Sequence, residues 1–184
     1  MRVIAGTAKG RPLRLDRSSS VRPTSDRLKE AMFSTLGPSV RDGRVLDLFA
    51  GSGALGIEAL SRGAGHATFV DSDRAAVATI RANLVATGFL DRAEVLDQTA
   101  ERFVASKRGG QFDLVLMDPP YTLGIPASLL TNLLESGRLR VDARVVVEVS
   151  SRLPAIELPP GYRLHQERRY GDSTLIYLTI EQGG

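Results

Sequence analysis

A regular alternation of short apolar strands with helical segments begins near residue 44 and constrains the fold more than any other feature of the chain. Apolar runs predict five strands, at residues 45–49, 67–70, 93–96, 112–117 and 144–149. Apolar residues at helical spacing predict helices between them. Strands that alternate with helices form a mostly parallel sheet with right-handed crossovers. Nearly continuous apolar strands indicate that both faces of this sheet are covered.

The two ends of the chain depart from this alternation. Residues 162–170 and 174–180 flank a Gly-Asp-Ser turn and predict an antiparallel hairpin at the sheet edge. Short strands at 3–5 and 12–15, then a helix up to Gly37, predict a small extension before the sheet. We therefore predict an α/β fold with a doubly wound, Rossmann-like sheet, mostly parallel with an antiparallel C-terminal hairpin, plus an N-terminal β-hairpin and helix.

The predicted domain organisation is an extension at residues 1–40 and a main domain at residues 41–184. A length of 184 residues fits this arrangement. The chain has no cysteine, which excludes disulfides, zinc–thiolate sites and cysteine nucleophiles and suits a reducing cytoplasm. No apolar run approaches the roughly 20 residues that span a bilayer, and the first residues do not resemble a signal peptide. We expect a cytoplasmic protein with no membrane segment.

Positive charge is concentrated near the N-terminus. Residues 1–45 contain ten Lys and Arg against four acidic residues, whereas the chain as a whole has a net charge of only +3. A basic segment joined to a mildly acidic body indicates an arm that grips a polyanion. The alternative is a solvated basic face without a partner. The candidate RNA-binding residues are Arg2, Lys9, Arg11, Arg14, Arg22 and Arg27.

A glycine-rich loop follows the first strand of the main domain. Gly51, Gly53 and Gly56 have the spacing of a dinucleotide-binding turn, and Asp71 lies twenty residues after Gly51, where a ribose-binding acid is expected. Asp47 argues against a dinucleotide, because its carboxylate would repel a pyrophosphate and attract a cationic ligand. S-adenosylmethionine, which has an ammonium and a sulfonium, fits better. Asp47 could also simply cap the following helix, and the glycines could form an ordinary tight turn.

A second motif, Asp118-Pro119-Pro120-Tyr121, directly follows the fourth strand. Two consecutive prolines hold the chain extended and remove two backbone donors. The Asp118 carboxylate and the nearby carbonyls then form an acceptor-only pocket for an amino group. Tyr121 offers a ring on which a base, flipped out if it was paired, can stack. The alternative is a rigid loop with a tyrosine that is there by chance.

These motifs resemble those of class I methyltransferases that modify amino groups. Upstream, the similarity narrows to the RsmD family of bacterial 16S rRNA guanine-N2 methyltransferases, through the segments Arg2–Gly6, Lys9–Arg11, Arg22–Thr24, Asp26–Arg27 with Glu30, Leu60–Ala64 and Tyr170–Asp172. Asp71 departs from this family, which usually has glutamate at that position. The tetrapeptide is shared with DNA adenine and protein glutamine methyltransferases, so the N-terminal segments carry the substrate assignment.

The resemblance implies S-adenosylmethionine as cofactor and a guanine of 16S rRNA as substrate, within a small ribosomal subunit or an assembly intermediate. It implies three catalytic residues, Asp118, Pro119 and Tyr121. The implied cofactor-binding residues are Asp47, Phe49, Ala50, Gly51, Gly53, Asp71, Ser72, Gln98, Thr99 and Asp118. We expect a monomer and no metal site.

Several alternatives stay open. Any of Asp97, Gln98 and Thr99 could contact the adenine, and Asp118 could either accept the proton or only orient the amine. Arg22, Thr24 and Arg27 could contact the methionine end of the cofactor instead of RNA. An NAD-dependent oxidoreductase leaves Asp118–Tyr121 unexplained, and a non-catalytic RNA-binding module leaves the glycine loop unexplained. DNA adenine-N6 and protein glutamine-N5 transfer are the nearest rival reactions.

Overall fold

The computed structural model describes residues 1–15, 25–106, 110–119, 126–154 and 156–181. Its helices are α1 (Asp26–Leu36), α2 (Ala54–Ser61), α3 (Arg74–Thr87), α4 (Ala100–Ala105) and α5 (Ala127–Glu135), with 3₁₀ turns at Gly37–Val40 and Leu90–Arg92. Its strands are β1 (Arg44–Leu48), β2 (His66–Asp71), β3 (Ala93–Asp97), β4 (Phe112–Met117), β5 (Leu139–Ser150), β6 (Tyr162–Tyr170) and β7 (Ser173–Ile180). None of the described helices is long and apolar enough to cross a bilayer.

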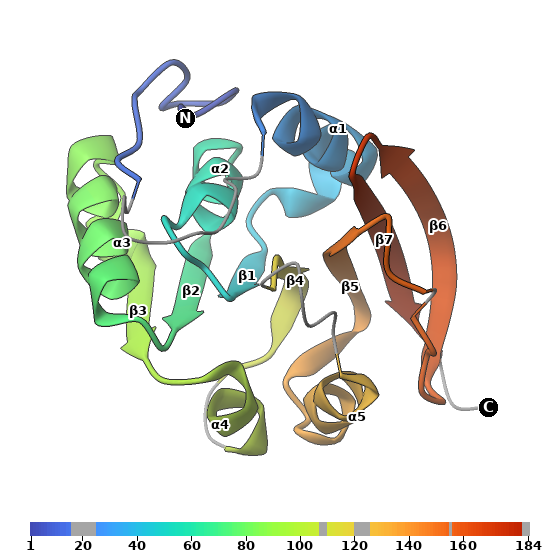
Figure 1. Cartoon of the computed structure of the whole chain (residues 1–184). Coiled ribbons are helices and arrows are strands. Elements are labelled where there is room, and N and C mark those ends of the chain that lie inside the picture. The colour runs from blue at the N-terminus through green and yellow to red at the C-terminus, as the bar shows by residue number, and fades with distance from the viewer. Residues whose placement is uncertain (16–24, 107–109, 120–125, 155, 182–184) are drawn as a thin grey trace.

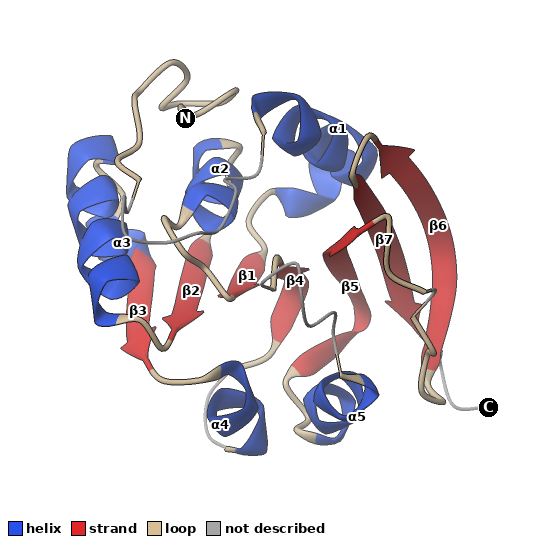
Figure 2. Cartoon of the chain, viewed as in Figure 1, coloured by secondary structure: helices blue, strands red, loops and turns tan. Residues whose placement is uncertain are grey.

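The strands form one sheet in the order β3-β2-β1-β4-β5-β7-β6. Strands β1 to β5 pair in parallel, while β7 is antiparallel to both β5 and β6. Figures 1 and 2 show α1, α2 and α3 on one face of the sheet and α4 and α5 on the other. This confirms the predicted doubly wound sheet with an antiparallel C-terminal hairpin.

The two faces of the sheet bury separate apolar clusters. Val45 and Leu116 pack with α1, α2 and α3, whereas Leu46 and Val115 face α4 and α5. This alternation along β1 and β4 explains why both strands read as continuous apolar runs. The strand order reverses between β1 and β4, and a crevice at their carboxyl ends is where ligands bind in sheets of this kind.

Two predicted elements differ in extent from the structure. The two arm segments of the predicted hairpin pair through the isolated bridge of Arg2 to Pro12 and neighbouring backbone bonds. The pairing is short because the next N–H groups, at residues 4 and 5, bond to α2 instead. Strand β5 begins at Leu139, five residues earlier than predicted. Its first half is exposed over Arg140–Asp142 and meets β4 through a register shift, so it lacks the apolar signal of the second half.

Residues 1–15, here called the N-terminal arm, pack against α2 and α3 (Figure 1). Val3, Ala8 and Leu13 of the arm are buried in the same cluster as α1 and α2. The Glu58 carboxylate of α2, itself fully buried, accepts bonds from the backbone N–H groups of Ile4 and Ala5 at 2.8 and 3.0 Å. The arm is therefore held on the main core by buried polar groups as well as by apolar contact.

Candidate active site

The predicted cofactor-binding residues follow the carboxyl ends of neighbouring strands. Asp47 and the glycine loop (residues 49–53) belong to the end of β1, Asp71 and Ser72 to the end of β2, and Gln98 and Thr99 to the end of β3. Asp118 and Pro119 follow β4 on the other side of β1. Pairing in register along β3, β2, β1 and β4 brings these segments to one edge of the sheet.

Asp47 is deeply buried, with 1% of its surface exposed. Its Oδ2 accepts the backbone N–H of Gly56 at 2.8 Å, so it caps the first turn of α2. Burial raises the pKa of Asp47 well above its usual range, and the carboxylates of Asp118 and Asp71 raise it further. Three carboxylates therefore interact at this crevice, which disfavours a phosphate and favours a cationic ligand.

Gly56 allows α2 to approach β2 closely. A Cβ at this position would lie 2.3 Å from Cε1 of Phe69 and 3.1 Å from Oδ2 of Asp47. The third glycine of the motif is therefore required for helix–strand packing, as in the dinucleotide fingerprint. The loop itself is held against β2 by the Ala50 N–H, which donates to the Val70 carbonyl at 3.1 Å.

Asp71 connects the end of β2 to the glycine loop. Its Oδ2 accepts the Gly51 N–H at 2.7 Å, and its Oδ1 accepts the Asp73 N–H at 2.9 Å. A carboxylate has about four lone-pair sites, so each oxygen retains capacity for a ligand hydroxyl. Asp71 is thus fixed in place without using up its ability to accept from a ribose.

The three candidates for the adenine contact differ in their surroundings. Asp97 is exposed and pairs with Arg74 at 3.7 Å. The Gln98 backbone N–H donates to the Asp71 carbonyl, and Gln98 is half-buried. The Thr99 hydroxyl caps α4 by accepting the Arg102 N–H at 3.2 Å. Gln98 is therefore the candidate whose side chain is neither in an ion pair nor in a helix cap among the described contacts.

The second motif is described only in its first half. Asp118 is half-buried and Pro119 is buried directly after β4. Pro120 and Tyr121 lie outside the described residues, so the stacking role of Tyr121 stays a prediction. Met117, directly before Asp118, is the register partner of Leu48, directly after Asp47, so the two motifs lie at one edge of the sheet.

A further carboxylate at this edge is one that sequence reasoning missed. Glu148 lies near the end of β5, directly after Val147, the register partner of Met117. It is 2% exposed and accepts a hydrogen bond from the Ser173 hydroxyl at 2.9 Å. The signal that could have identified it is an acid inside the otherwise apolar run of residues 145–149.

The predicted RNA-binding residues lie on the surface of the N-terminal arm and of α1. Arg2, Lys9, Arg11, Arg14 and Arg27 are exposed, while Arg22 lies outside the described residues, as does Thr24. Arg2 pairs with Asp26 at 3.3 Å, and the Arg11 guanidinium donates to the Ala86 carbonyl of α3 at 2.7 Å. These contacts hold part of the basic set in place on the surface.

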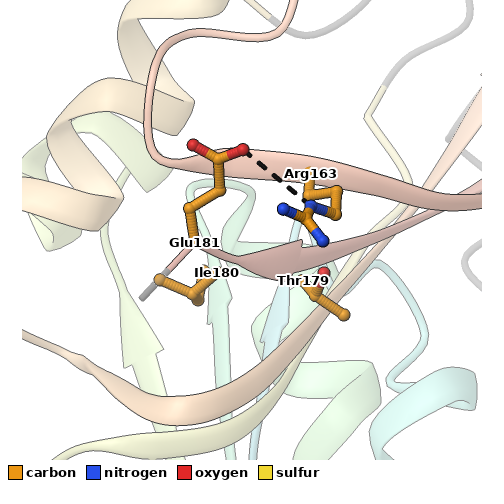
Figure 3. Close-up of a pocket in the computed structure, with 4 residues that line it drawn as sticks. All are labelled: Arg163, Thr179, Ile180 and Glu181. Atoms are coloured by element: carbon orange, nitrogen blue, oxygen red, sulfur yellow. Dashed lines mark ion pairs between the residues drawn. The ribbon is translucent and has the colours of Figure 1, made fainter. Parts of the chain in front are cut away.

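A hollow of about 400 Å³ lies away from these residues, on the β6–β7 edge of the sheet (Figure 3). It is lined by Arg163, Thr179, Ile180 and Glu181, and its two charged side chains face each other at 4.0 Å. The hollow contains none of the predicted site residues, and its charges pair with each other, so it is not a candidate for the cofactor site.

The raised pKa of Asp47 leads to a prediction about stability. Because the folded pKa exceeds the unfolded value of about 3.9, the folded protein retains a proton that the unfolded chain has lost. Asp47 therefore lowers the free energy of unfolding increasingly as the pH rises above about 4. We expect Asp47→Asn, which keeps an acceptor oxygen for Gly56, to be more stable than wild type at neutral pH.

Urea unfolding followed between pH 4 and pH 8 measures this difference. The gap between variant and wild type should close toward the acidic end. Asp142→Asn, which changes an exposed carboxylate of β5, is the matched control and should follow wild type throughout. A variant that is less stable than wild type at neutral pH would mean that the charge of Asp47 is compensated in the folded state.

Comparison with known proteins gives consistent similarities. The model of the family described as Conserved hypothetical protein 95 matches residues 1–179. The chain is 44% identical to YlbH of Bacillus subtilis, named as a candidate rRNA methyltransferase, over 93% of this chain and 94% of that protein. It is 39% identical to ribosomal RNA small subunit methyltransferase D of Escherichia coli, over 93% and 85%. A solved structure named as a candidate methyltransferase of Escherichia coli, yhhF, is 36% identical, with a TM-score of 0.87 and 98% of both chains covered.

Proposed function

The chain belongs to the RsmD family, and from that premise we propose that it transfers a methyl group from S-adenosylmethionine to the exocyclic N2 amine of a guanine in 16S rRNA. The family relationship supports methyl transfer to small-subunit rRNA. The choice of guanine N2 rests on the resemblance of the N-terminal segments and on the acceptor chemistry of Asp118.

The observation that carries the proposal is the group of interacting carboxylates at the strand-order reversal. Asp71 bonds to the glycine loop that follows Asp47, and Asp118 follows Met117, the register partner of Leu48, so both carboxylates lie at the strand ends beside buried Asp47. A dinucleotide would bring its pyrophosphate toward this negative field, whereas a sulfonium and an ammonium are attracted to it. The donor set therefore fits S-adenosylmethionine better than NAD.

Each cofactor-binding residue has a role that its position suggests. Asp71 would accept from the ribose hydroxyls, and the loop from Phe49 to Gly53 would let the backbone approach the cofactor closely. Ser72 and one of Gln98 and Thr99 would meet the adenine. Asp71 and Asp118 would supply negative charge around the cofactor, and Asp47 would hold the first turn of α2 near the methionine end. When bound, the cofactor supplies an electrophilic methyl group.

The amine-binding role falls to Asp118 and Pro119. The Asp118 carboxylate accepts a hydrogen bond from the N2 amine and stabilises the positive charge that develops on it. The Pro119 carbonyl is a second acceptor, and Tyr121 stacks on the base. Holding the amine in line with the methyl group contributes about 7–11 kcal/mol through proximity and orientation. The amine need not be deprotonated before it reacts, because it becomes strongly acidic once it is methylated and then loses its proton to Asp118 or to water, while the demethylated cofactor leaves.

The N-terminal arm would bind phosphates of the rRNA. Its exposed side chains, Arg2, Lys9, Arg11 and Arg14, present positive charge on one segment beside α2 and α3 (Figure 1). Such contacts give affinity that falls with salt and little sequence information. An arm of this size would not select one guanine in naked rRNA, so we propose a small subunit or an assembly intermediate as substrate.

Methyl transfer from radiolabelled S-adenosylmethionine tests the function. The substrates are small ribosomal subunits from a strain that lacks the corresponding enzyme, naked 16S rRNA and duplex DNA, followed by nucleoside analysis. We expect labelled N2-methylguanosine, with more label in subunits than in naked rRNA. Labelled N6-methyladenosine, or its deoxy form in DNA, would retain Asp118 as the amine-binding residue and refute the guanine assignment. No label in any nucleic acid would redirect the search to protein substrates.

A further inference from the structure

A single buried amide joins the N-terminal arm to the glycine loop. Asn83 of α3 is 0% exposed, and its Nδ2 donates both to the Arg14 carbonyl at 3.0 Å and to the Ser52 carbonyl at 2.9 Å. Its Oδ1 accepts the Arg14 N–H at 2.8 Å. The side chain thus uses both amide hydrogens and its oxygen, and its partners lie on two segments far apart in the sequence.

On the arm side, Asn83 holds the arm near its C-terminal end, at Arg14. Arg14 is bonded through both its N–H and its carbonyl, so its backbone is fixed in the manner of a strand pair. Neighbouring contacts seat the same stretch. Leu13 is 5% exposed, and Arg11 donates to the Ala86 carbonyl about one helical turn further along α3. Displacement of the arm would therefore distort or break the two hydrogen bonds between Arg14 and the Asn83 amide.

On the loop side, Asn83 holds the centre of the glycine loop. Ser52 lies between Gly51, which is bonded to Asp71, and Gly53, whose N–H donates to the Ala50 carbonyl at 2.7 Å. The Ser52 carbonyl and the Gly53 N–H belong to the same peptide group, so a change in the direction of this carbonyl would also turn the Gly53 N–H away from the Ala50 carbonyl and open the loop. The arm reaches the loop at a second point, since the Ser52 hydroxyl lies 3.9 Å from the Met1 sulfur.

We infer that Asn83 is a positioning residue that couples the seating of the N-terminal arm to the conformation of the cofactor loop. The inference rests on the proposed function for the identity of the two ligands. RNA bound to the arm would favour the state in which the arm is packed on α2 and α3, and this state would bind the cofactor more tightly. Because binding free energies are reciprocal, bound cofactor would tighten RNA binding by the same factor.

Asn83 is a better candidate for this coupling than the other buried polar residues that hold the arm. Glu58 and Ser61 of α2 bond to the backbone of arm residues 4–8. Lys29 donates to the Arg2 carbonyl at 2.6 Å from α1. These three side chains seat the arm on neighbouring helices, whereas the Asn83 amide bonds to both the arm and the glycine loop.

A double-mutant cycle on the full-length protein tests the coupling, with the dissociation constant of S-adenosylmethionine as the readout. Asn83→Leu conserves the shape of the side chain and removes all three bonds, and we expect it to weaken cofactor binding about tenfold. Leu13→Ala loosens the arm without touching the loop. It should weaken cofactor binding about threefold in the wild-type background and leave it unchanged in the Asn83→Leu background, because coupled sites are non-additive.

Thr87→Val is the matched control. Thr87 is buried and lies about one turn after Asn83 on α3, and its hydroxyl donates to the carbonyls of residues 83 and 84 in the same helix. It should bind the cofactor like wild type. If Asn83→Leu does not fold, Asn83→Asp replaces it, since it keeps the acceptor for Arg14 and loses both donated bonds. Hydrogen exchange of the loop amides adds a second readout, and Leu13→Ala should accelerate it.

The outcomes separate the two proposals. Wild-type protein that does not bind S-adenosylmethionine would refute the proposed function. Wild-type protein that binds it, with Leu13→Ala at wild-type affinity and wild-type loop exchange, would refute the coupling alone. Equal effects of Leu13→Ala in both backgrounds would show that the arm acts on the cofactor by a route other than Asn83, which also overturns the inference.

Discussion

Replacing Asp118 by alanine should reduce kcat by a factor of about 10²–10⁴ or more, while the affinity for S-adenosylmethionine changes little. The carboxylate directly follows β4 and is the group that would orient the amine and stabilise its developing charge. Unchanged cofactor affinity in the same variant would show that the site is otherwise intact and that the fall in turnover reports chemistry.

Asp118→Asn separates the two roles of the carboxylate. The amide keeps one acceptor oxygen but loses the charge and the ability to take a proton. A loss as large as that in the alanine variant would indicate that charge or proton transfer dominates, and a much smaller loss would indicate orientation. Single-turnover rates on small subunits, with cofactor affinity measured on the same samples, provide the comparison. Normal turnover in Asp118→Ala would refute the assignment of this residue.

The parts of the fold that could be predicted from the sequence are those with a local periodic signal. The strands β1 to β4 are largely apolar, and their predicted ends lie within about one or two residues of those observed. The first half of β5 was missed because Arg140, Val141 and Asp142 are exposed where the strand leaves the core. The arm was predicted as two strands, and the structure shortens their pairing to one bridge because part of the backbone bonds to the side chains of Glu58 and Ser61.

The site was predictable where its residues lie within one motif and unpredictable where they meet only in three dimensions. Asp47, the glycine loop and Asp71 were identified from their spacing after a strand, and the structure places them together. The capping role of Asp47 was left open as an alternative, and the structure shows the bond to Gly56. Asn83 and Glu148 gave only the weak signal of a polar residue at an apolar position, since their partners lie 25 to 69 residues away.

The predicted boundary at residue 40 separates the N-terminal extension from the main domain. In the structure, the arm and α1 bury their apolar side chains in the same cluster as the main sheet, so the boundary stays a prediction about function and not about packing. An arm packed in this way can transmit strain to the site, whereas a flexible tail could not. The basic residues of the extension are therefore proposed to act from a fixed surface. A substitution that dislodges the arm should then affect both RNA binding and stability.

Gly6→Ala is the substitution expected to dislodge the arm most strongly. A Cβ at Gly6 would lie 1.8 Å from the Ser61 carbonyl oxygen of α2, and the residue has a φ of +84°. Backbone strain of about 1–2 kcal/mol and overpacking of about 1–3 kcal/mol predict a total loss of about 2–5 kcal/mol. The arm would move rather than α2 and lose the bonds from Thr7 and Ala8 to Ser61.

Gly10→Ala separates the steric clash with Ser61 from the backbone strain of a positive φ. Gly10 lies in the same turn of the arm and has a φ of +83°, but a Cβ at this position would have nothing within 4 Å. It should lose only about 1–2 kcal/mol. Urea unfolding and filter binding to small-subunit RNA at fixed salt measure both consequences. We expect Gly6→Ala to bind RNA more weakly than Gly10→Ala, which should stay near wild type. Equal losses in the two variants would mean that the contact with Ser61 does not seat the arm, and that the basic residues act without a fixed position.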